Sequence, residues 1–587
     1  MPARPHQFAA LNAVIADFDA GYRQVVLSMA TGTGKTYVFA EMYEALKSRL
    51  PGKMLVLAHT EELIDQTVTA LRVMYPSLRV DKEMAEHKAD PSKADIIVAS
   101  VASLGRKGTK RVDKYNWDEW DKIVVDEAHH TPANSYRNIL TAAGVLQHNP
   151  AKLLLGVTAT TQRADGRPLE EFYKKISYSY GLRQAIDDGW LVDVKGFRVN
   201  TVTSLDGVAT SNGDFNKDEL ADKVNNPERN NRVVTAWIEL GQNRQTVAFA
   251  ANIAHAQALA LEFKARGVNA EAIWGEDPLR SQKLEHHRAG HTKVLVNVGV
   301  LVEGYDDWRI GCILLARPTQ SESLFTQMCG RGTRLQEGYG NLKELQALPT
   351  EGQPGYEGEI DCIKQDLIVI DVVDNSSKHS LMTLPSLMGL PDGFDLKGGS
   401  AVGALKVIET AQEDNPNVDF TKLDLLTNLT SFIEQVNLFE LRFPAEVESN
   451  SDLKWCRAVS GGYRMTIPGP MIGNPPRRDY SRDGEVCIKQ NLLGQWEIKI
   501  DVKNVKSEGV RNTMEEAFVA ADHQLRERAK YAMMLLDRKP AWNGEPMKKN
   551  GRQHNFLRKL YPHMKFPANM TKGQASFWID KRMKGKR

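Results

Sequence analysis

The chain has few cysteines, no long apolar run and almost no net charge. Its 587 residues include five cysteines, none of them in a CxxC pair: Cys312, Cys329, Cys362, Cys456 and Cys487. Neither a disulfide framework nor a zinc ribbon is therefore expected. Apolar runs long enough to span a membrane, about 18 residues or more, do not occur, and the N-terminus MPARPHQFAALNAV lacks the apolar core of a signal peptide. We expect a cytoplasmic protein that makes no membrane contact.

The net charge of +2 hides an uneven distribution of charged residues. Residues 538–587 contain 14 Lys and Arg against Glu545 and Asp580, a net charge of +12, so the first 537 residues carry −10. A basic tail on an acidic body predicts a polyanionic partner, although a tail that only improves solubility would have the same composition.

The length and the hydrophobic pattern predict several domains. A chain of 65.6 kDa is too long for one core. Short apolar runs alternate with helical stretches over residues 24–199, a polar stretch interrupts them at 203–220, and the alternation resumes over 246–373. This pattern is typical of parallel sheets covered by helices. We predict two α/β domains, residues 1–200 and 227–384, joined by a linker over 201–226.

The remaining third of the chain has a different pattern. Residues 385–450 are expected to be mostly helical. Over residues 451–535, short runs such as QWEIKIDV alternate with turn residues before one helical stretch, which predicts a small antiparallel sheet with one helix. Residues 536–587 are expected to form a basic helical module.

Residues 29–36, MATGTGKT, form a glycine-rich turn that ends in Lys-Thr. Glycines let the backbone wrap phosphate oxygens, and the next helix points its positive end at them. Lys35 would pair with the β and γ phosphates, and the Thr36 hydroxyl would hold Mg²⁺. The strict pattern has glycine where Met29 stands, so the loop alone leaves kinases and other NTPases open. The predicted nucleotide-binding residues of the loop are Thr31, Gly32, Thr33, Gly34, Lys35 and Thr36.

The apolar run KIVVD ends in Asp126 and is followed by Glu127. The two acids could simply cap a helix, since acids favour a helix N-terminus. The run would also deliver Asp126 to the carboxyl edge of the sheet that presents the glycine-rich loop, where ligands bind in α/β folds. There Asp126 would join Thr36 in the Mg²⁺ shell, and Glu127 would orient and deprotonate the attacking water.

Six segments occur in a fixed order: MATGTGKT, LAHTEELIDQ, DEAH, GVTATTQRADG, VLVNVGVLVEGYD and QMCGRGTR. Over about residues 1–385 the chain thereby resembles the DEAH-type superfamily 2 helicases and translocases. It is more similar to the DNA-acting branches (RadD-like, XPB-like and restriction-motor subunits) than to RNA-remodelling enzymes, although it lacks the zinc module of RadD-like proteins. A phage or mobile-element origin is compatible with this arrangement.

The resemblance implies two RecA-like lobes that use ATP and Mg²⁺. It also implies a DNA partner, single-stranded or branched, and a place in DNA repair, recombination or replication. A monomer is expected.

The segment QMCGRGTR places Arg331 and Arg334 at i, i+3, which predicts that both lie on one helical face. Two surface arginines on a helix would have the same spacing. The resemblance implies that these arginines, with Gln327, act across a cleft between the lobes. A guanidinium aimed at the γ-phosphoryl oxygens increases the rate of comparable NTPases about 10³–10⁵-fold. The site would then be complete only when the lobes close.

Other roles also follow from the resemblance. Gln7 in RPHQF would recognise adenine, although the same residues could only start a helix. Two residues of the second lobe would face the nucleotide: Gly304 and Asp306. Three residues would couple hydrolysis to motion: His129, Thr158 and Thr160.

A motor that holds a nucleic-acid backbone without recognising its sequence needs small hydroxyls, amides and helix N-termini. Such residues occur where apolar runs end: His59, Thr60, Ser100, Ser103, Asn252, His255 and Asn297. Each of them alone could equally be a helix cap.

We therefore predict an ATP-dependent helicase or translocase that unwinds or remodels forked or branched DNA. A double-strand translocase that does not separate strands and an RNA helicase are the alternatives. The sheet at 451–502 could bind a junction or only brace the motor. Aromatic residues of the tail could stack on bases, but most of them are expected to form the core of a helical module.

Overall fold

The computed structural model describes most of the chain up to residue 414 and shorter stretches after it. The described residues are 3–106, 108, 110–159, 169–211, 214–302, 304–305, 307–336, 340–346, 364–375, 381–391, 394–414, 420, 423–428, 445–453, 455–458, 461–467, 469, 471–472, 477–478, 484–491, 493–502, 505–530, 532–536, 547, 552–561, 566, 570–572 and 575. Two compact units account for the chain: Met1–Leu387 with Asp395–Val402, and Met388–Phe394 with Gly403–Arg587.

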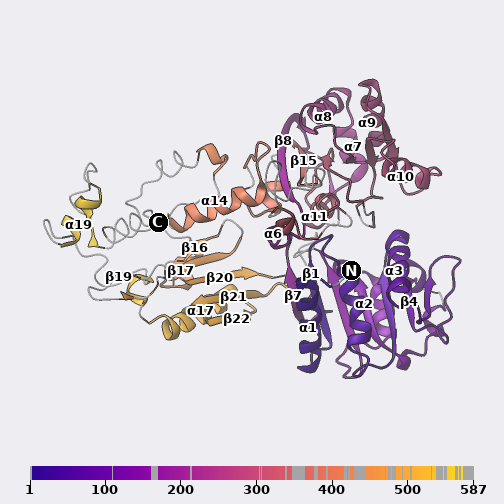
Figure 1. Cartoon of the computed structure of the whole chain (residues 1–587), viewed down its shortest axis with the longest axis horizontal. Helices are drawn as coiled ribbons and strands as arrows, with labels where there is room; N and C mark the ends of the chain where they lie inside the picture. Colours follow the sequence, from indigo (N-terminus) through magenta and orange to yellow (C-terminus); the bar gives the residue numbers. More distant parts are fainter. Residues whose placement is uncertain are drawn as a thin grey trace, which may run out of the picture. The chain divides into compact units, whose positions relative to one another are not determined.

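The first lobe of the first unit is built on a seven-stranded sheet in the order β3-β4-β2-β5-β6-β1-β7, with every pairing parallel (Figure 1). Its strands are β1 (Gln24–Met29), β2 (Lys53–Ala58), β3 (Val80–Glu83), β4 (Ile96–Ser100), β5 (Trp120–Asp126), β6 (Leu153–Thr158) and β7 (Lys175–Tyr180). Its helices are α1 (Pro5–Asp19), α2 (Lys35–Ala45), α3 (Glu61–Met74), α4 (Val101–Leu104), α5 (Asn134–Ala142) and α6 (Leu182–Asp187). The central strands are buried almost throughout, as expected for a parallel sheet between helices.

The strand order decides which loops meet. Parallel strands present their carboxyl ends at one edge of the sheet. Because β5, β6 and β1 are neighbours, the segments after Asp126, Thr158 and Met29 lie together at that edge.

The second lobe of the same unit has a six-stranded parallel sheet in the order β12-β13-β11-β14-β15-β8. Its strands are β8 (Asp193–Ser204), β11 (Thr246–Phe249), β12 (Ala270–Ile273), β13 (Val294–Asn297), β14 (Cys312–Leu315) and β15 (Asp366–Asn375). Its helices are α7 (Lys217–Val224), α8 (Pro227–Leu240), α9 (Ile253–Ala265), α10 (Arg280–Arg288), α11 (Glu322–Gly330), α12 (Leu342–Gln346) and α13 (Leu384–Leu387). The predicted fold class, two tandem RecA-like α/β domains with parallel sheets, is confirmed.

The predicted boundary at residue 200 and the linker over 201–226 are wrong. Residue 200 lies inside β8, which pairs in parallel with β15 from Asp193 opposite Asp366 to Ser204 opposite Asn375. The short strands β9 (Thr210–Ser211) and β10 (Asp214–Phe215) and the helix α7 follow. Phe215 of β10 and Leu220 of α7 are buried in one small hydrophobic core. An edge strand is half exposed and therefore polar at many positions, which made this segment resemble a loop.

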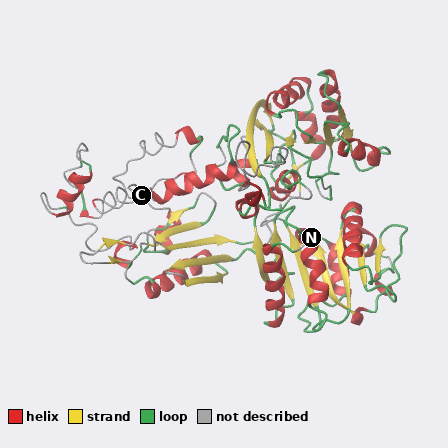
Figure 2. Cartoon of the chain, in the orientation of Figure 1, coloured by secondary structure: helices red, strands yellow, loops and turns green. Residues whose placement is uncertain are grey.

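The second unit contains the predicted antiparallel sheet. Its five strands have the order β16-β17-β20-β21-β22: β16 (Cys456–Arg457), β17 (Tyr463–Ile467), β20 (Gly484–Gln490), β21 (Trp496–Val502) and β22 (Val505–Arg511). Helix α17 (Met514–Arg528) packs on it through Phe518 and Leu525. A two-stranded sheet, β18 (Met471–Ile472) and β19 (Arg477–Arg478), is separate. Figure 2 distinguishes the strands of this unit from its helices.

The helices predicted for residues 385–450 are described in part. They are α14 (Ala401–Asp414), the 3₁₀ turn η6 (Leu426–Asn428) and α16 (Ala445–Asn450). Two further helices of the second unit are α18 (Met533–Leu536) and α19 (Arg552–Leu560). None of the described helices is both long and apolar enough to cross a membrane.

Part of the basic C-terminal module is described. Leu557 of α19 is buried with Met570 and Ala575, and Tyr561 and Phe566 pack edge to face beside them. These two aromatics therefore belong to a small core, as predicted. Phe556 is 41% exposed. Trp542, Phe577 and Trp578 lie outside the described residues.

Candidate active site between the two lobes

The glycine-rich loop connects β1 to α2, with Gly32 and Gly34 at φ values of 85° and 88°. Left-handed backbone of this kind favours glycine. A Cβ at Gly34 would also lie 2.1 Å from Gln7 Nε2. Gln7 Nε2 donates to the Thr33 carbonyl at 3.1 Å, and Gln7 Oε1 accepts from the Arg4 backbone N–H at 2.9 Å. Gln7 is thus placed beside the loop, and adenine recognition stays a prediction.

Two buried carboxylates face the loop from the end of β5. Asp126 and Glu127 are each 4% exposed, and Lys35 Nζ lies 3.5 Å from Glu127 Oε1. Burial and, after it, the adjacent Glu127 carboxylate raise the pKa of Asp126 to about 6, while Lys35 opposes the shift. Lys35 therefore forms an ion pair with Glu127, the residue that the sequence predicts to activate the attacking water.

Glu127 has a left-handed backbone, with φ 51° and ψ 59°. This conformation costs an ordinary residue roughly 1–2 kcal/mol. The Glu127 N–H donates to Asp126 Oδ1 at 3.0 Å, so the backbone of this turn fixes the Asp126 carboxylate at the carboxyl edge of the sheet.

His129 connects the carboxylates to β6. Its Nδ1 lies 3.5 Å from Glu127 Oε2 and 3.3 Å from Thr158 Oγ1. The His130 ring lies 4.1 Å from His129 and 4.4 Å from His59 at the end of β2, measured between ring centroids. A continuous set of side chains thus runs from Glu127 toward two strand ends, which is the placement that coupling residues need. Thr160 lies outside the described residues.

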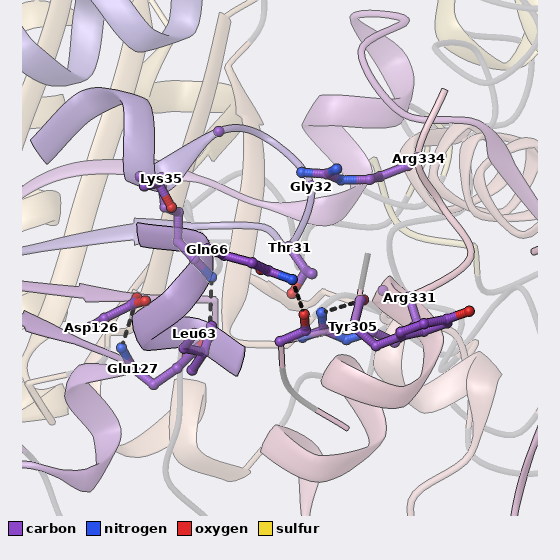
Figure 3. A pocket seen from close by; sticks show the side chains of 14 residues that line it. Thr31, Gly32, Lys35, Leu63, Gln66, Asp126, Glu127, Tyr305, Arg331 and Arg334 are labelled. Atoms are coloured by element: carbon purple, nitrogen blue, oxygen red, sulfur yellow. Dashed lines mark hydrogen bonds and ion pairs between the residues drawn. The ribbon is translucent and has the colours of Figure 1, made fainter. Parts of the chain in front are cut away.

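One pocket brings residues of both lobes together (Figure 3). It is lined by Thr31, Gly32, Gly34, Lys35, Thr36, Leu63, Gln66, Asp126, Glu127, Gly304, Tyr305, Gly330, Arg331 and Arg334. Figure 3 shows the lysine and the two carboxylates on one side of this pocket and the two arginines on the other. The glycine-rich loop and the arginines therefore face a common cleft.

The arginines are held differently from the prediction. Helix α11 ends at Gly330, so Arg331 and Arg334 lie in the turn after it and share no helical face. Arg331 Nε and Nη1 donate to the carbonyls of Val302 and Tyr305 at 2.9 and 3.0 Å. Arg334 packs on the glycine-rich loop, where a Cβ at Gly32 would lie 3.1 Å from its Cγ. Gln327 is 3% exposed within α11 and lies outside the lining of the pocket.

Sequence reasoning missed three residues that connect the lobes. Gln66 Nε2 donates to the Gly304 carbonyl, and Glu62 forms an ion pair with Arg280 of α10. Gly304 has φ 76°, and a Cβ there would lie 2.7 Å from the Cβ of Glu62. Glu62 and Gln66 are spaced i, i+4 in LAHTEELIDQ, a signal for one exposed helical face that could have found them. Asp306 lies outside the described residues.

Several predicted nucleic-acid contacts serve as helix caps or loop anchors. Thr60 Oγ1 accepts from the Leu63 N–H at 3.3 Å, and Asn252 Oδ1 accepts from the His255 N–H at 3.0 Å. Ser103 Oγ accepts from the Ala85 N–H at 3.0 Å, and Ser100 is buried at the start of α4. Strands β4 and β2 are neighbours, so Ser100, the last residue of β4, and Thr60, two residues after β2, lie at adjacent strand ends.

Two of the predicted contacts are wrong because they are fully buried. His255 and Asn297 are both 0% exposed. His255 Nδ1 accepts from the Ala251 N–H at 3.2 Å, and burial lowers the pKa of this histidine to about 3. Asn297 donates to the Ala248 carbonyl at 2.9 Å and accepts from the Leu301 N–H at 3.3 Å. Both side chains hold loops of the second lobe and cannot reach a nucleic acid.

The residues predicted to hold Mg²⁺ fit that ion. Thr36 and Asp126 both line the pocket, and hydroxyl and carboxylate oxygens are the ligands that Mg²⁺ prefers. Within the described part of the chain no group of three or more His, Cys, Asp or Glu is placed to hold a metal ion by itself.

Comparison with known proteins supports the resemblance to superfamily 2 helicases. Residues 1–163 match the family model described as type III restriction enzyme, res subunit. IRC3 of Saccharomyces cerevisiae, a proposed ATP-dependent helicase, is 34% identical over 343 residues, which are 57% of this chain and 49% of IRC3. The irc3 protein of Schizosaccharomyces pombe, a proposed mitochondrial ATP-dependent helicase, is 32% identical over 395 residues, 66% of this chain and 60% of that protein.

A further relative is the endonuclease subunit of the type I restriction enzyme EcoAI of Escherichia coli, 26% identical over 371 residues, 58% of this chain and 45% of that subunit. The chain spans between 45% and 60% of the length of these three relatives. The resemblance to superfamily 2 helicases of the restriction-motor type is confirmed.

Proposed function

We propose that the chain is an ATP-dependent DNA helicase or translocase of superfamily 2. The observation that carries this proposal is that one pocket is lined by Lys35, Glu127, Arg331 and Arg334 together. These residues supply a phosphate-binding cation, a carboxylate for the attacking water and two guanidinium groups. They come from two lobes, so hydrolysis would depend on how the lobes approach each other.

The chemistry follows from the charges in the pocket. The β and γ phosphates would sit in the backbone amides of the glycine-rich loop and displace Glu127 from Lys35. Glu127 would then accept a proton from the attacking water, and the arginines would stabilise the charge that spreads over the γ-phosphoryl oxygens. Thr36 and Asp126 would hold Mg²⁺, which when bound neutralises charge on the phosphates.

Three features favour DNA as the track. The family model and the EcoAI relative are restriction-enzyme subunits. The last fifty residues carry a net charge of +12, which suits a polyanion. Hydroxyl groups at the ends of β2 and β4 suit backbone contacts that ignore base sequence. Translocation along duplex DNA without strand separation, and action on RNA, remain the alternatives.

Steady-state ATPase measurements with different nucleic acids test the proposal. We expect kcat to rise several-fold with single-stranded or forked DNA. Stimulation by RNA alone would overturn the choice of DNA, and no ATP turnover under any condition would overturn the whole proposal. Strand-displacement assays over forks, three-way and four-way junctions and RNA duplexes then separate unwinding from translocation, with Lys35→Ala as the inactive control.

Removing residues 538–587 tests the role assigned to the basic tail. The truncated chain should bind DNA more weakly, and the logarithm of its affinity should depend less steeply on salt, since fewer counterions are released. An unchanged salt slope would assign the tail to solubility.

A further inference from the structure

Lys364 lies just before β15 and points its ammonium group into the second lobe. Its Nζ donates to three backbone carbonyls: to that of Trp308 at 3.0 Å, and to those of Ile310 and Gly332. Burial lowers the pKa of this ammonium to about 7, although the residue as a whole is half-buried. An ammonium carries three N–H donors and no acceptor, so three carbonyls match it fully.

The three carbonyls belong to the two segments that place the arginines. Gly332 lies in the turn between Arg331 and Arg334. Trp308 and Ile310 follow the loop whose carbonyls, at Val302 and Tyr305, accept the two hydrogen bonds of Arg331. One ammonium therefore joins the arginine turn to the loop that orients Arg331.

The turn has little room to move around this contact. A Cβ at Gly332 would lie 2.3 Å from Cδ1 of Leu367 in β15, so the backbone of the turn packs directly on that strand. The Tyr305 side chain is anchored as well, because its hydroxyl lies 3.0 Å from His287 Nδ1 and 3.4 Å from Asp307 Oδ2.

We propose that Lys364 is a positioning residue for the arginines of the pocket. It acts through the backbone of the arginine turn and of the loop at 302–310, and it touches neither the nucleotide nor the reacting atoms. This inference rests on the proposed hydrolysis of ATP in the pocket. Losing the three N–H donors would release the turn, and a displacement of about 1 Å can cost a reaction about 10²-fold.

The protonation of Lys364 provides an independent readout. The neutral amine has two N–H donors, so at least one of the three carbonyls loses its donor when the ammonium deprotonates. Asp307 and Asp366 favour the charged form and Arg244 opposes it. The ammonium is present below pH of about 7 and is lost above it, and kcat should therefore decline on the alkaline side of that pH.

The first experiment compares Lys364→Met with Lys152→Met in DNA-stimulated ATPase assays of the full chain. Lys152 is a buried lysine at the amino end of β6, far from the pocket, and donates to the carbonyls of Trp117 and Ala143 at 2.7 and 2.8 Å. Thermal unfolding checks that both variants are folded. Lys364→Met should lower kcat about 10- to 100-fold with KM for ATP changed less than about threefold, whereas Lys152→Met should keep kcat per folded molecule.

A mutant cycle tests whether Lys364 acts through the two arginines. In a background that carries both Arg331→Ala and Arg334→Ala, Lys364→Met should have little further effect on the remaining kcat, because coupled residues are not additive. Independent, multiplying losses would overturn the inference. So would an unchanged kcat in Lys364→Met while the parent chain hydrolyses ATP; a parent chain without hydrolysis would instead remove the proposed function.

If Lys364→Met does not fold, Lys364→Arg keeps the inference testable. Arginine stays charged throughout the accessible pH range, so the alkaline decline of kcat should move up by at least about one pH unit. A profile that matches the parent chain would contradict the role of Lys364.

Discussion

The most direct test of the pocket is Glu127→Gln. Glutamine has nearly the size of glutamate, so the left-handed backbone at φ 51° and the hydrogen bond from the residue 127 N–H to Asp126 Oδ1 can both persist. The substitution removes the basic carboxylate and the ion pair with Lys35, in which Nζ and Oε1 are 3.5 Å apart. It therefore separates the chemistry of Glu127 from its structural role.

The expected loss follows from the role of a general base. Proton transfer by a positioned group contributes about 10²–10⁴ in rate, or roughly 3–5 kcal/mol in the activation barrier. ATP binding should be equal or tighter, because Lys35 no longer has to leave a carboxylate to meet the phosphates. The variant is thus expected to bind ATP and DNA normally while its kcat falls by at least about 10².

Phosphate release under saturating ATP and DNA measures kcat, and titration with a nucleotide analogue measures affinity. Glu83→Gln is a matched control, since Glu83 is also buried and ion-paired, in this case with Arg111 at the edge strand β3. The control should lose stability and keep kcat. A kcat of Glu127→Gln within threefold of the parent chain would remove Glu127 from catalysis and leave the pocket without an identified base.

Three further substitutions probe the second lobe. Arg334→Ala should lower kcat by at least about 10² without unfolding the chain, as phosphate release and thermal unfolding would show. A smaller effect would assign the stabilisation of the γ-phosphoryl charge to Arg331 alone. Gly304→Ala places a Cβ 2.7 Å from Glu62 at φ 76°, so the lobes should meet less closely and KM for ATP should rise; an unchanged KM would show that this contact does not influence binding. Burial raises the pKa of Asp371 to about 7. The stability that this carboxyl contributes is therefore full at low pH and is lost as pH rises to about 7. Asp371→Asn stays neutral, so its Tm should fall less than that of the parent chain between pH 5 and pH 8, and parallel Tm curves would contradict the assignment.

Local patterns in the sequence were enough to predict the chemistry at the ends of strands. Short continuous apolar runs such as the IVV of KIVVD are typical of strands that are buried on both faces of a parallel sheet, and parallel strands bring their carboxyl ends to one edge. Lys35, Asp126 and Glu127 could be placed together for that reason. The glycines of MATGTGKT were informative in the same way, because left-handed backbone at Gly32 and Gly34 favours that residue.

Tertiary structure alone decided which polar residues face the pocket and which are buried. Asn297 and His255 are polar residue types that are common in surface contacts, yet both are completely buried here. The edge strand β8 acquires its identity only by pairing with β15, more than 160 residues later in the chain.

The surroundings of the arginines could not be predicted either. Sequence spacing suggested a helical face, but α11 ends at Gly330, and the turn after it is held by Lys364 and by backbone carbonyls of the loop at 302–310. Periodicity describes neighbours within about four residues. Contacts between segments far apart in the chain arise only when the sheet and its loops are assembled, and those contacts decide where the two arginines lie.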